Sequence, residues 1–213
     1  MTETEHKPAF QALDRRQVLL GTGAAALVAL GASGSPAHAA KEVPLEKLLA
    51  DNGLPMLEYG KKDAKVTIVE YASLTCPACA NFHNAIFPKF KEKYIDTGKV
   101  RFIVREFPFD QFSAAVSMLA RCPGGDRVLP FMGVLFKTQD QWRVQYPVPK
   151  LMEIAKQAGI TKEGFEKCLD HQDLLQKLIK QRDTAANDCG VRGTPTFFIY
   201  GKPMLGGYGM DNF

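Results

Sequence analysis

Apolar and polar positions along the chain predict four strands. The first is a short run rich in β-branched residues, a composition typical of a buried strand. The second follows Gly98, the third follows a Gly-Thr-Pro turn, and Gly201-Lys202 is expected to form a hairpin turn before the last. The strands are expected at 66–72, 100–108, 196–200 and 203–205.

A helix is expected directly after the first strand. Its apolar residues recur every four positions and therefore line one face: Phe82, Ile86, Phe90 and Tyr94. Cys79 lies three residues before Phe82 and shares this buried face. Pro77 suits a first helical turn, where its missing N–H costs nothing, and Pro88 predicts a kink.

Residues 112–190 carry a helical pattern. Thr161 is expected to cap one helix, and a longer helix should run from near Asp173 to Cys189 with Gly190 as its C-terminal cap. Residues 41–60 have a loop-like pattern. The order strand, helix, strand, helical block, strand, strand predicts an α/β fold with an inserted block of roughly eighty helical residues.

Composition is that of an ordinary soluble globular protein. Of 213 residues, 46% are hydrophobic and 23% are charged, which fits one domain with a real core or a small domain that carries an insertion. The net charge of +4 is spread along the chain, and basic residues mostly alternate with acidic ones. Without a basic stripe and interleaved aromatics, we expect no nucleic-acid partner.

The first 39 residues have the three parts of a cleaved signal peptide. A polar stretch ends at Arg15-Arg16, an apolar Gly/Ala-rich run reaches about Ala32, and an Ala-x-Ala site predicts cleavage after Ala39. The adjacent arginines and the weakly hydrophobic run resemble a twin-arginine signal, which indicates a bacterial source. An ordinary secretory signal and a retained anchor are the alternatives.

Export would place the five cysteines in an oxidising compartment, and their odd number leaves at least one unpaired within the chain. Cys76 and Cys79 form a Cys-x-x-Cys motif where the first helix begins. Free backbone N–H groups and the helix dipole stabilise an anion there, and the thiolate is the form that attacks disulfides. Cys76 should therefore be the exposed attacking sulfur and Cys79 the buried resolving one.

Two other interpretations of this motif remain. The pair could be half of a zinc site, with His83 as the nearby additional ligand, although the paired clusters typical of structural zinc are missing from the sequence. It could also be a static disulfide, although a loop this short gains little entropy from the bond. We therefore expect no metal and no cofactor.

The segment 70–79, Glu-Tyr-Ala-Ser-Leu-Thr-Cys-Pro-Ala-Cys, together with Gly-Thr-Pro-Thr-Phe at 193–197, resembles the DsbA-like periplasmic thiol–disulfide oxidoreductases. The resemblance implies a thioredoxin-like fold with a helical domain inserted between the second strand and the cis-Pro strand. It divides the mature chain into 40–108, the insertion 109–190, and 191–213. It also implies a cis Thr194–Pro195 bond that faces the two sulfurs.

The resemblance also suggests roles for the neighbours of the motif. Glu70 matches a buried acid thought to assist proton transfer at the resolving thiol, although it could instead reach solvent at the strand end. The best-studied oxidants of the family have His where this chain has Ala78, so the pKa of Cys76 should be less depressed and the couple less oxidising. We expect His83 to be an ordinary packed or surface histidine.

Some DsbA-like proteins have a second disulfide in the helical domain, and the resemblance therefore implies a Cys122–Cys168 bond. Two buried free thiols are the alternative. Cys189 is then the unpaired cysteine, expected to be a buried thiol rather than a redox partner. The last residues, 206–213, resemble the approach to the helix that closes this fold, and that helix is missing from the sequence.

We therefore predict a monomeric periplasmic oxidase. It would pass its disulfide to unfolded or newly exported cysteine-containing proteins and be reoxidised by a DsbB-type, quinone-linked membrane oxidase or another redox partner. The alternatives are a disulfide reductase or isomerase and a non-catalytic peptide-binding holdase. Only roughly 25 residues separate the predicted cleavage site from the first strand, which leaves no room for the dimerisation segment of known isomerases.

Overall fold

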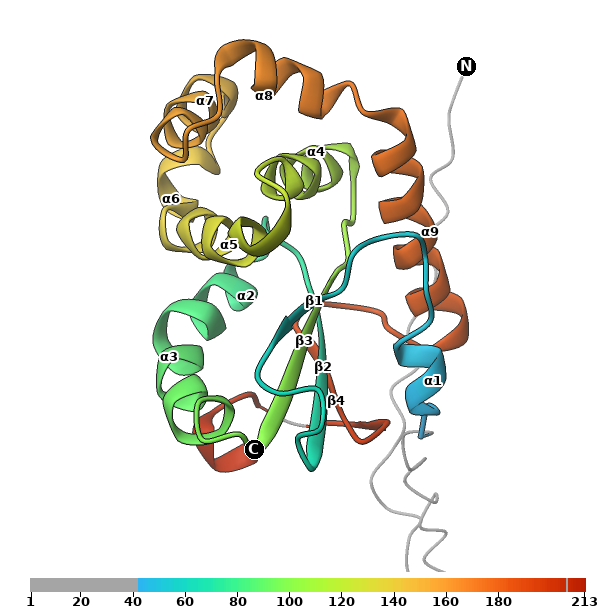
Figure 1. Ribbon diagram of the computed structural model, residues 1–213. Coiled ribbons are helices and arrows are strands. Elements are labelled where there is room, and N and C mark those ends of the chain that lie inside the picture. Colours follow the sequence, from blue (N-terminus) through green and yellow to red (C-terminus); the bar gives the residue numbers. More distant parts are fainter. Residues whose placement is uncertain (1–41, 206) are drawn as a thin grey trace, which may run out of the picture. The chain divides into compact units, whose positions relative to one another are not determined.

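The computed structural model describes residues 42–205 and 207–213, so the predicted signal peptide lies outside the described residues. Within this part, the strands form a single sheet in the order β1-β3-β2-β4-β5 (Figure 1). They are β1 (Leu57–Tyr59), β2 (Val66–Ala72), β3 (Val100–Glu106), β4 (Thr196–Ile199) and β5 (Lys202–Pro203).

Strand β2 lies at the centre of the sheet, parallel to β3 and antiparallel to β4. The four expected strands are confirmed, but β1, which pairs antiparallel with β3, falls in the segment that we expected to be a loop. The last strand is Lys202–Pro203 rather than 203–205, because the turn is made by Tyr200 (φ 51°) and Gly201 (φ 82°) and not by Gly201 and Lys202. Gly201 packs closely against the carbonyl of Val43, which leaves no space for a side chain.

The helix after β2 is built from short segments. They are α2 (Pro77–Asn81), a π-helical stretch at Phe82–Ile86, α3 (Phe87–Phe90) and a second π-helical stretch at Lys91–Ile95. Pro88 lies in α3 between the two π-helical stretches, where the regular hydrogen-bond ladder is already interrupted. The kink predicted at Pro88 therefore appears as an interruption of the regular α-helix by π-helical stretches on both sides of α3.

Side chains of the central strands alternate between two cores. Ile68 and Phe102 face the segmented helix and pack with Phe82 and Phe90, whereas Val69 faces the opposite side. That side is covered by α1 (Leu45–Leu48) and α9 (Gln172–Asp188), as Figure 1 shows. The last residue, Phe213, adds its ring to the first core, with its centroid 4.8 Å from that of Phe90.

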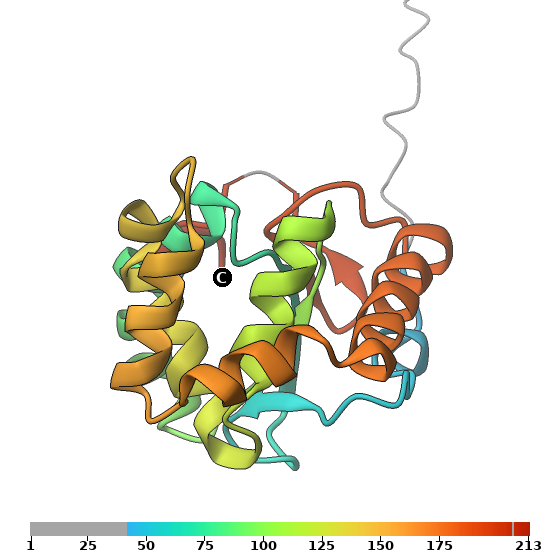
Figure 2. The ribbon, with the colours of Figure 1, turned by 90° about the horizontal axis from the view of Figure 1, so that it is seen from above.

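The helices between β3 and β4 are α4 (Gln111–Arg121), α5 (Val128–Lys137), α6 (Gln139–Trp142), α7 (Val148–Gln157), α8 (Lys162–Leu169) and α9. In the view of Figure 2, α4 lies between the α5–α7 group and α9. Thr161 caps α8 as predicted, by accepting a hydrogen bond from the Gly164 N–H. In the described residues, no helix is both long and apolar enough to cross a membrane.

Candidate active site

The Cys-x-x-Cys motif lies where β2 passes into α2. Cys76 has an extended backbone (φ −82°, ψ 121°) immediately before the helix, and Pro77 is the first helical residue. Because Pro77 begins the helix, its missing N–H disrupts no intrahelical bond. Cys76 is half-buried and Cys79 is fully buried, the exposure expected of an attacking and a resolving sulfur.

The surroundings of Cys76 favour its thiolate. A hydrogen bond from the Cys79 thiol has the largest effect and, with help from Thr194 and from the N–H groups of Cys79 and Ala78, it outweighs burial and lowers the pKa of Cys76 to about 5. Thioredoxin and DsbA have cysteine pKa values of about 7 and about 3.5. The Cys76 pKa lies between these two values, and the effect of Ala78 in place of His stays a prediction.

Cys79 is in the opposite situation. Burial, followed by the hydrogen bond to Cys76 and the negative charge of Glu70, raises the pKa of the Cys79 thiol far above its usual range. Cys79 therefore stays protonated in the reduced protein. To act as a nucleophile, it must first pass its proton to a nearby base.

The turn before β4 lies over the first sulfur. The Thr194–Pro195 bond is cis, as the resemblance implied, and the Sγ of Cys76 lies 3.2 Å from the carbonyl oxygen of Thr194. From the other side, the amide of Gln139 in α6 donates to the carbonyls of Leu74 (2.7 Å) and Cys76 (3.1 Å). Gln139 thus attaches the helical block to the active-site loop, a contact that no sequence motif announced.

Glu70 and His83 form a buried pair next to the cysteines. Glu70 has no solvent exposure, which rules out the alternative that it reaches solvent, and its Oε2 lies 2.9 Å from the Nε2 of His83. His83 also stacks on Phe136 of α5, with ring centroids 4.3 Å apart. His83 is packed, as expected, but its carboxylate partner was missed. The helical spacing offered a signal, because His83 lies one turn beyond Cys79 on the face that covers β2.

The remaining cysteines lie away from the motif. A disulfide joins Cys122, at the end of α4, to Cys168 in α8, which confirms the implied pairing. Cys189, which follows α9, is a buried free thiol whose pKa is raised by burial. This burial agrees with the expectation that Cys189 is a buried thiol.

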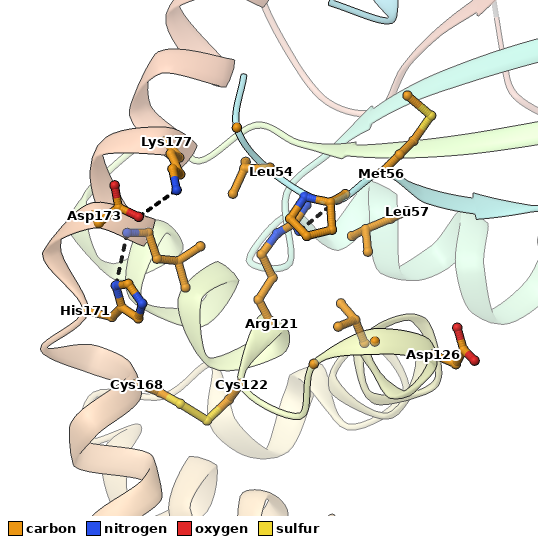
Figure 3. Close-up of a pocket in the computed structure, with 16 residues that line it drawn as sticks. Leu54, Met56, Leu57, Arg121, Cys122, Asp126, Cys168, His171, Asp173 and Lys177 are labelled. Carbon is orange, nitrogen blue, oxygen red and sulfur yellow. Dashed lines mark hydrogen bonds and ion pairs between the residues drawn. A yellow bond between two sulfur atoms is a disulfide. The ribbon is translucent and has the colours of Figure 1, made fainter. Parts of the chain in front are cut away.

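The Cys122–Cys168 disulfide borders a cavity of about 500 Å³ between α4, α9 and the 53–57 segment (Figure 3). Two of its basic residues already have acidic partners: Lys177 pairs with Asp173 at 2.6 Å, and Arg121 with Glu106 at 2.5 Å. Neither Cys76 nor Cys79 lines this cavity. The redox motif therefore lies outside it.

Several known proteins are similar to this chain. The family described as thioredoxin matches residues 52–207. A Rickettsia bellii protein, named as a candidate protein-disulfide oxidoreductase, is 38% identical over 67% of this chain and 56% of its own length. Disulfide bond formation protein D of Bacillus subtilis is 30% identical over 70% of this chain and 69% of its own length.

A solved structure is also similar. The crystal structure of α-DsbA1 from Wolbachia pipientis has 35% identity and a TM-score of 0.64, and the match covers 68% of this chain and 75% of that one. The chain spans only 55% to 62% of the length of its Rickettsia relatives.

A five-stranded sheet with a Cys-x-x-Cys helix and a facing cis-proline turn defines the class of thioredoxin-fold redox proteins. Within this class, the inserted helices and the similar proteins indicate the DsbA-like group. The chain belongs to the thioredoxin family, within its DsbA-like group.

Proposed function

We propose that the protein exchanges thiols and disulfides through Cys76 and Cys79 and introduces disulfides into exported proteins. The observation that carries this proposal is the contrast between the two sulfurs. Cys76 is half-exposed with a pKa lowered to about 5, whereas Cys79 is fully buried with a raised pKa. Stabilising the reduced form of a cysteine pair makes its disulfide a stronger oxidant.

The reaction begins at the exposed sulfur. A substrate thiolate attacks the Sγ of Cys76, the Cys76–Cys79 bond breaks, and Cys79 leaves with the bonding electrons and takes up a proton. A second substrate thiolate then attacks the substrate sulfur of the mixed disulfide. Cys76 leaves as a thiolate, and its low pKa makes it a good leaving group.

The neighbouring residues support these two steps. Thr194 lies against Cys76 and is joined to Pro195 by the cis bond, and the backbone of this turn would pair with the bound polypeptide. Pro77 and Ala78 begin the helix whose N–H groups stabilise the thiolate, and Glu70 would exchange a proton with Cys79.

The same proposal includes where the protein acts and which partners it has. The signal peptide at 1–39 would direct the protein to the periplasm by the twin-arginine or the general secretory route. There it would act as a monomer, without a cofactor, on unfolded or newly exported cysteine-containing proteins. A DsbB-type, quinone-linked membrane oxidase or another redox partner would restore its disulfide.

A reductase or isomerase is the second candidate, because the Cys76 pKa of about 5 lies above that of DsbA. A non-catalytic holdase would leave the two cysteine environments without a role.

The proposal is tested by mixing the oxidised protein with a reduced, unfolded peptide that carries two cysteines. We expect one peptide disulfide per protein, with loss of peptide thiols and gain of protein thiols, and no transfer by the Cys76→Ser variant. No transfer by the unmodified protein would overturn the oxidase. Reduction of an oxidised peptide by the reduced protein, without the reverse reaction, would favour the reductase.

A further inference from the structure

The buried Glu70–His83 pair is more than a packing contact. The side chain of Glu70 has no exposure and that of His83 is 8% exposed, so the pair is almost completely withdrawn from water. Only one carboxylate oxygen, Oε2, is bound to His83. Within the part of the chain that the structure describes, the buried Oε1 has no hydrogen-bond partner. A buried carboxylate with a free oxygen is costly, and such groups gather at functional sites.

Cys79 shares the surroundings of this pair. Glu70 lies between Ile68 and Ala72 on the face of β2 that packs in the same core as Cys79. Its charge contributes to the raised pKa of the Cys79 thiol, after burial and the hydrogen bond to Cys76. His83 lies four residues after Cys79 on the helix that covers β2. The sulfur, the carboxylate and the imidazole therefore meet on one buried face.

Few other titratable groups face the pair. Strands β3 and β4 place Val104 and Phe197 beside Glu70, and α5 contributes the ring of Phe136. Strand β1 contributes Tyr59, whose pKa is raised to about 12 by burial and by the charge of Glu70, so it stays neutral near pH 7. Proton exchange at Glu70 near neutral pH is therefore left to His83 and Cys79.

The helical block holds the imidazole in place. The rings of His83 and Phe136 are stacked within 8° of parallel. The next residue, Asn84, donates to the carbonyl of Phe136 at 3.1 Å. Helix α5 thereby fixes the orientation of His83 toward the carboxylate.

We propose that His83 carries protons between solvent and Glu70, and thereby supplies the proton that Cys79 gains on leaving a disulfide and removes the one that it loses on forming it. This role rests on the proposed thiol–disulfide exchange. His83 acts through Glu70 and is a positioning residue, whereas Glu70 would exchange the proton with the sulfur. The slight exposure of His83 gives the buried carboxylate a route to water.

The proton balance follows the disulfide chemistry. When a substrate thiolate attacks Cys76, the electron pair of the broken S–S bond goes to the Cys79 sulfur. That thiolate takes a proton from Glu70, Glu70 takes one from the His83 imidazolium, and His83 takes one from water. When the disulfide re-forms, the proton moves the opposite way, and the oxidised partner accepts the two electrons.

The test compares His83→Gln with the unmodified protein. Glutamine keeps a hydrogen-bonding group near Glu70 but cannot carry an extra proton. The rate at which the oxidised protein reacts with a dithiol peptide is measured by stopped flow from pH 5 to 9, using the fluorescence of Trp142, the single tryptophan. His171→Gln is the matched control, because it removes an exposed imidazole far along the chain at the start of α9.

We expect His83→Gln to slow the reaction about tenfold near pH 7, at the lower end of the usual effect of proton transfer by a side chain. The factor by which its rate falls should vary with pH, while the Cys76 thiolate absorbance keeps its midpoint. His171→Gln should behave like the unmodified protein. Phe136→Leu, which keeps an apolar side chain but removes the stacking, should slow the reaction by a smaller factor.

An unchanged rate and pH profile in His83→Gln would overturn the role of His83 and leave the exchange activity intact. The role would also be overturned by a loss that is equal at every pH and accompanied by a shifted Cys76 midpoint, since that indicates a structural effect. If the unmodified protein does not react at all, the proposed function fails and this role fails with it.

Discussion

The two cysteine pairs of this chain lie in different surroundings. Cys76 and Cys79 are at the start of a helix, one sulfur half-exposed under a cis-proline turn and the other buried near a carboxylate. Cys122 and Cys168 are 46 residues apart and join α4 to α8. The polar neighbour of the Cys122 sulfur is the carbonyl oxygen of Gly164 at 3.7 Å, an acceptor that cannot stabilise a thiolate.

Reactivity therefore depends on what surrounds the sulfurs rather than on the presence of two nearby cysteines. At the motif, the groups around Cys76 favour its charge, whereas burial and Glu70 oppose charge on Cys79. This inequality allows one sulfur to leave as an anion and requires proton transfer at the other. The second pair closes a long loop, and we expect it to affect stability rather than activity.

Removing the attacking sulfur of the first pair, or both sulfurs of the second pair, gives the largest contrast. Cys76→Ser should abolish transfer of disulfides to a dithiol peptide, because it removes the sulfur that substrate attacks. The Cys122→Ala/Cys168→Ala double variant should retain transfer. Thiol counting during the reaction measures both, and loss of transfer in the double variant would break the distinction between the pairs.

A titration of the reduced protein should separate the two sulfurs of the motif. Thiolate absorbance should rise with a midpoint near pH 5, where Cys76 ionises, with no contribution from Cys79 near neutral pH. This first rise should be missing in Cys76→Ser. A midpoint near the ordinary thiol pKa of about 9 would contradict the assignment.

The same shift predicts the direction of a pH effect on folding. The folded pKa of Cys76, about 5, lies below the ordinary value of 9.0. Its contribution to the stability of the reduced protein is therefore complete above pH 9 and is lost as the pH falls through about 5. Urea unfolding of the reduced protein and of Cys76→Ser at several pH values measures this contribution, and a difference that grows toward acid would have the wrong sign.

Loss of the second disulfide should appear in stability instead of activity. A disulfide typically contributes about 2 to 4 kcal/mol of unfolding free energy, and the chain-entropy description puts a loop of this length at the upper end of that range. The double variant should lose about this much in urea unfolding, with no change in the midpoint of the thiolate titration. A double variant as stable as the parent would show that the bond does not constrain the helical block.

The Ala78→His variant should have the smallest of these effects. An imidazole immediately before Cys79 should further stabilise the Cys76 thiolate and lower its pKa below the present value of about 5. A decrease of about one pKa unit corresponds to roughly 1.4 kcal/mol and makes the disulfide about tenfold more oxidising. A matched Ala78→Gln variant, which is polar but uncharged, should change the redox equilibrium less.

The sequence predicts local features of this molecule better than distant contacts. The buried strand at 66–72, the Thr161 cap and the Gly190 helix end depend on neighbouring residues, and all three are present. Strand β1 was missed because three residues carry too little periodicity, and only pairing with β3 defines it.

The candidate site also combines local features that the sequence predicts with distant contacts that it does not. The positions of Cys76 and Cys79 follow from one short motif, whereas the partner of Glu70 comes from a different element. The contact of Gln139 with the active-site loop crosses more than sixty residues of chain and carries no spacing rule. These long-range polar contacts complete the site, and the fold alone brings them together.

The most direct test of the central claim is the redox equilibrium of the domain from Ala40 onward with glutathione, with Cys76→Ser as control. The claim that the Cys76 environment stabilises the reduced form predicts a couple well above the roughly −270 mV of thioredoxin. A couple at or below that value would contradict the claim and indicate a reductase. The absence of any thiol-dependent transition would remove the redox function altogether.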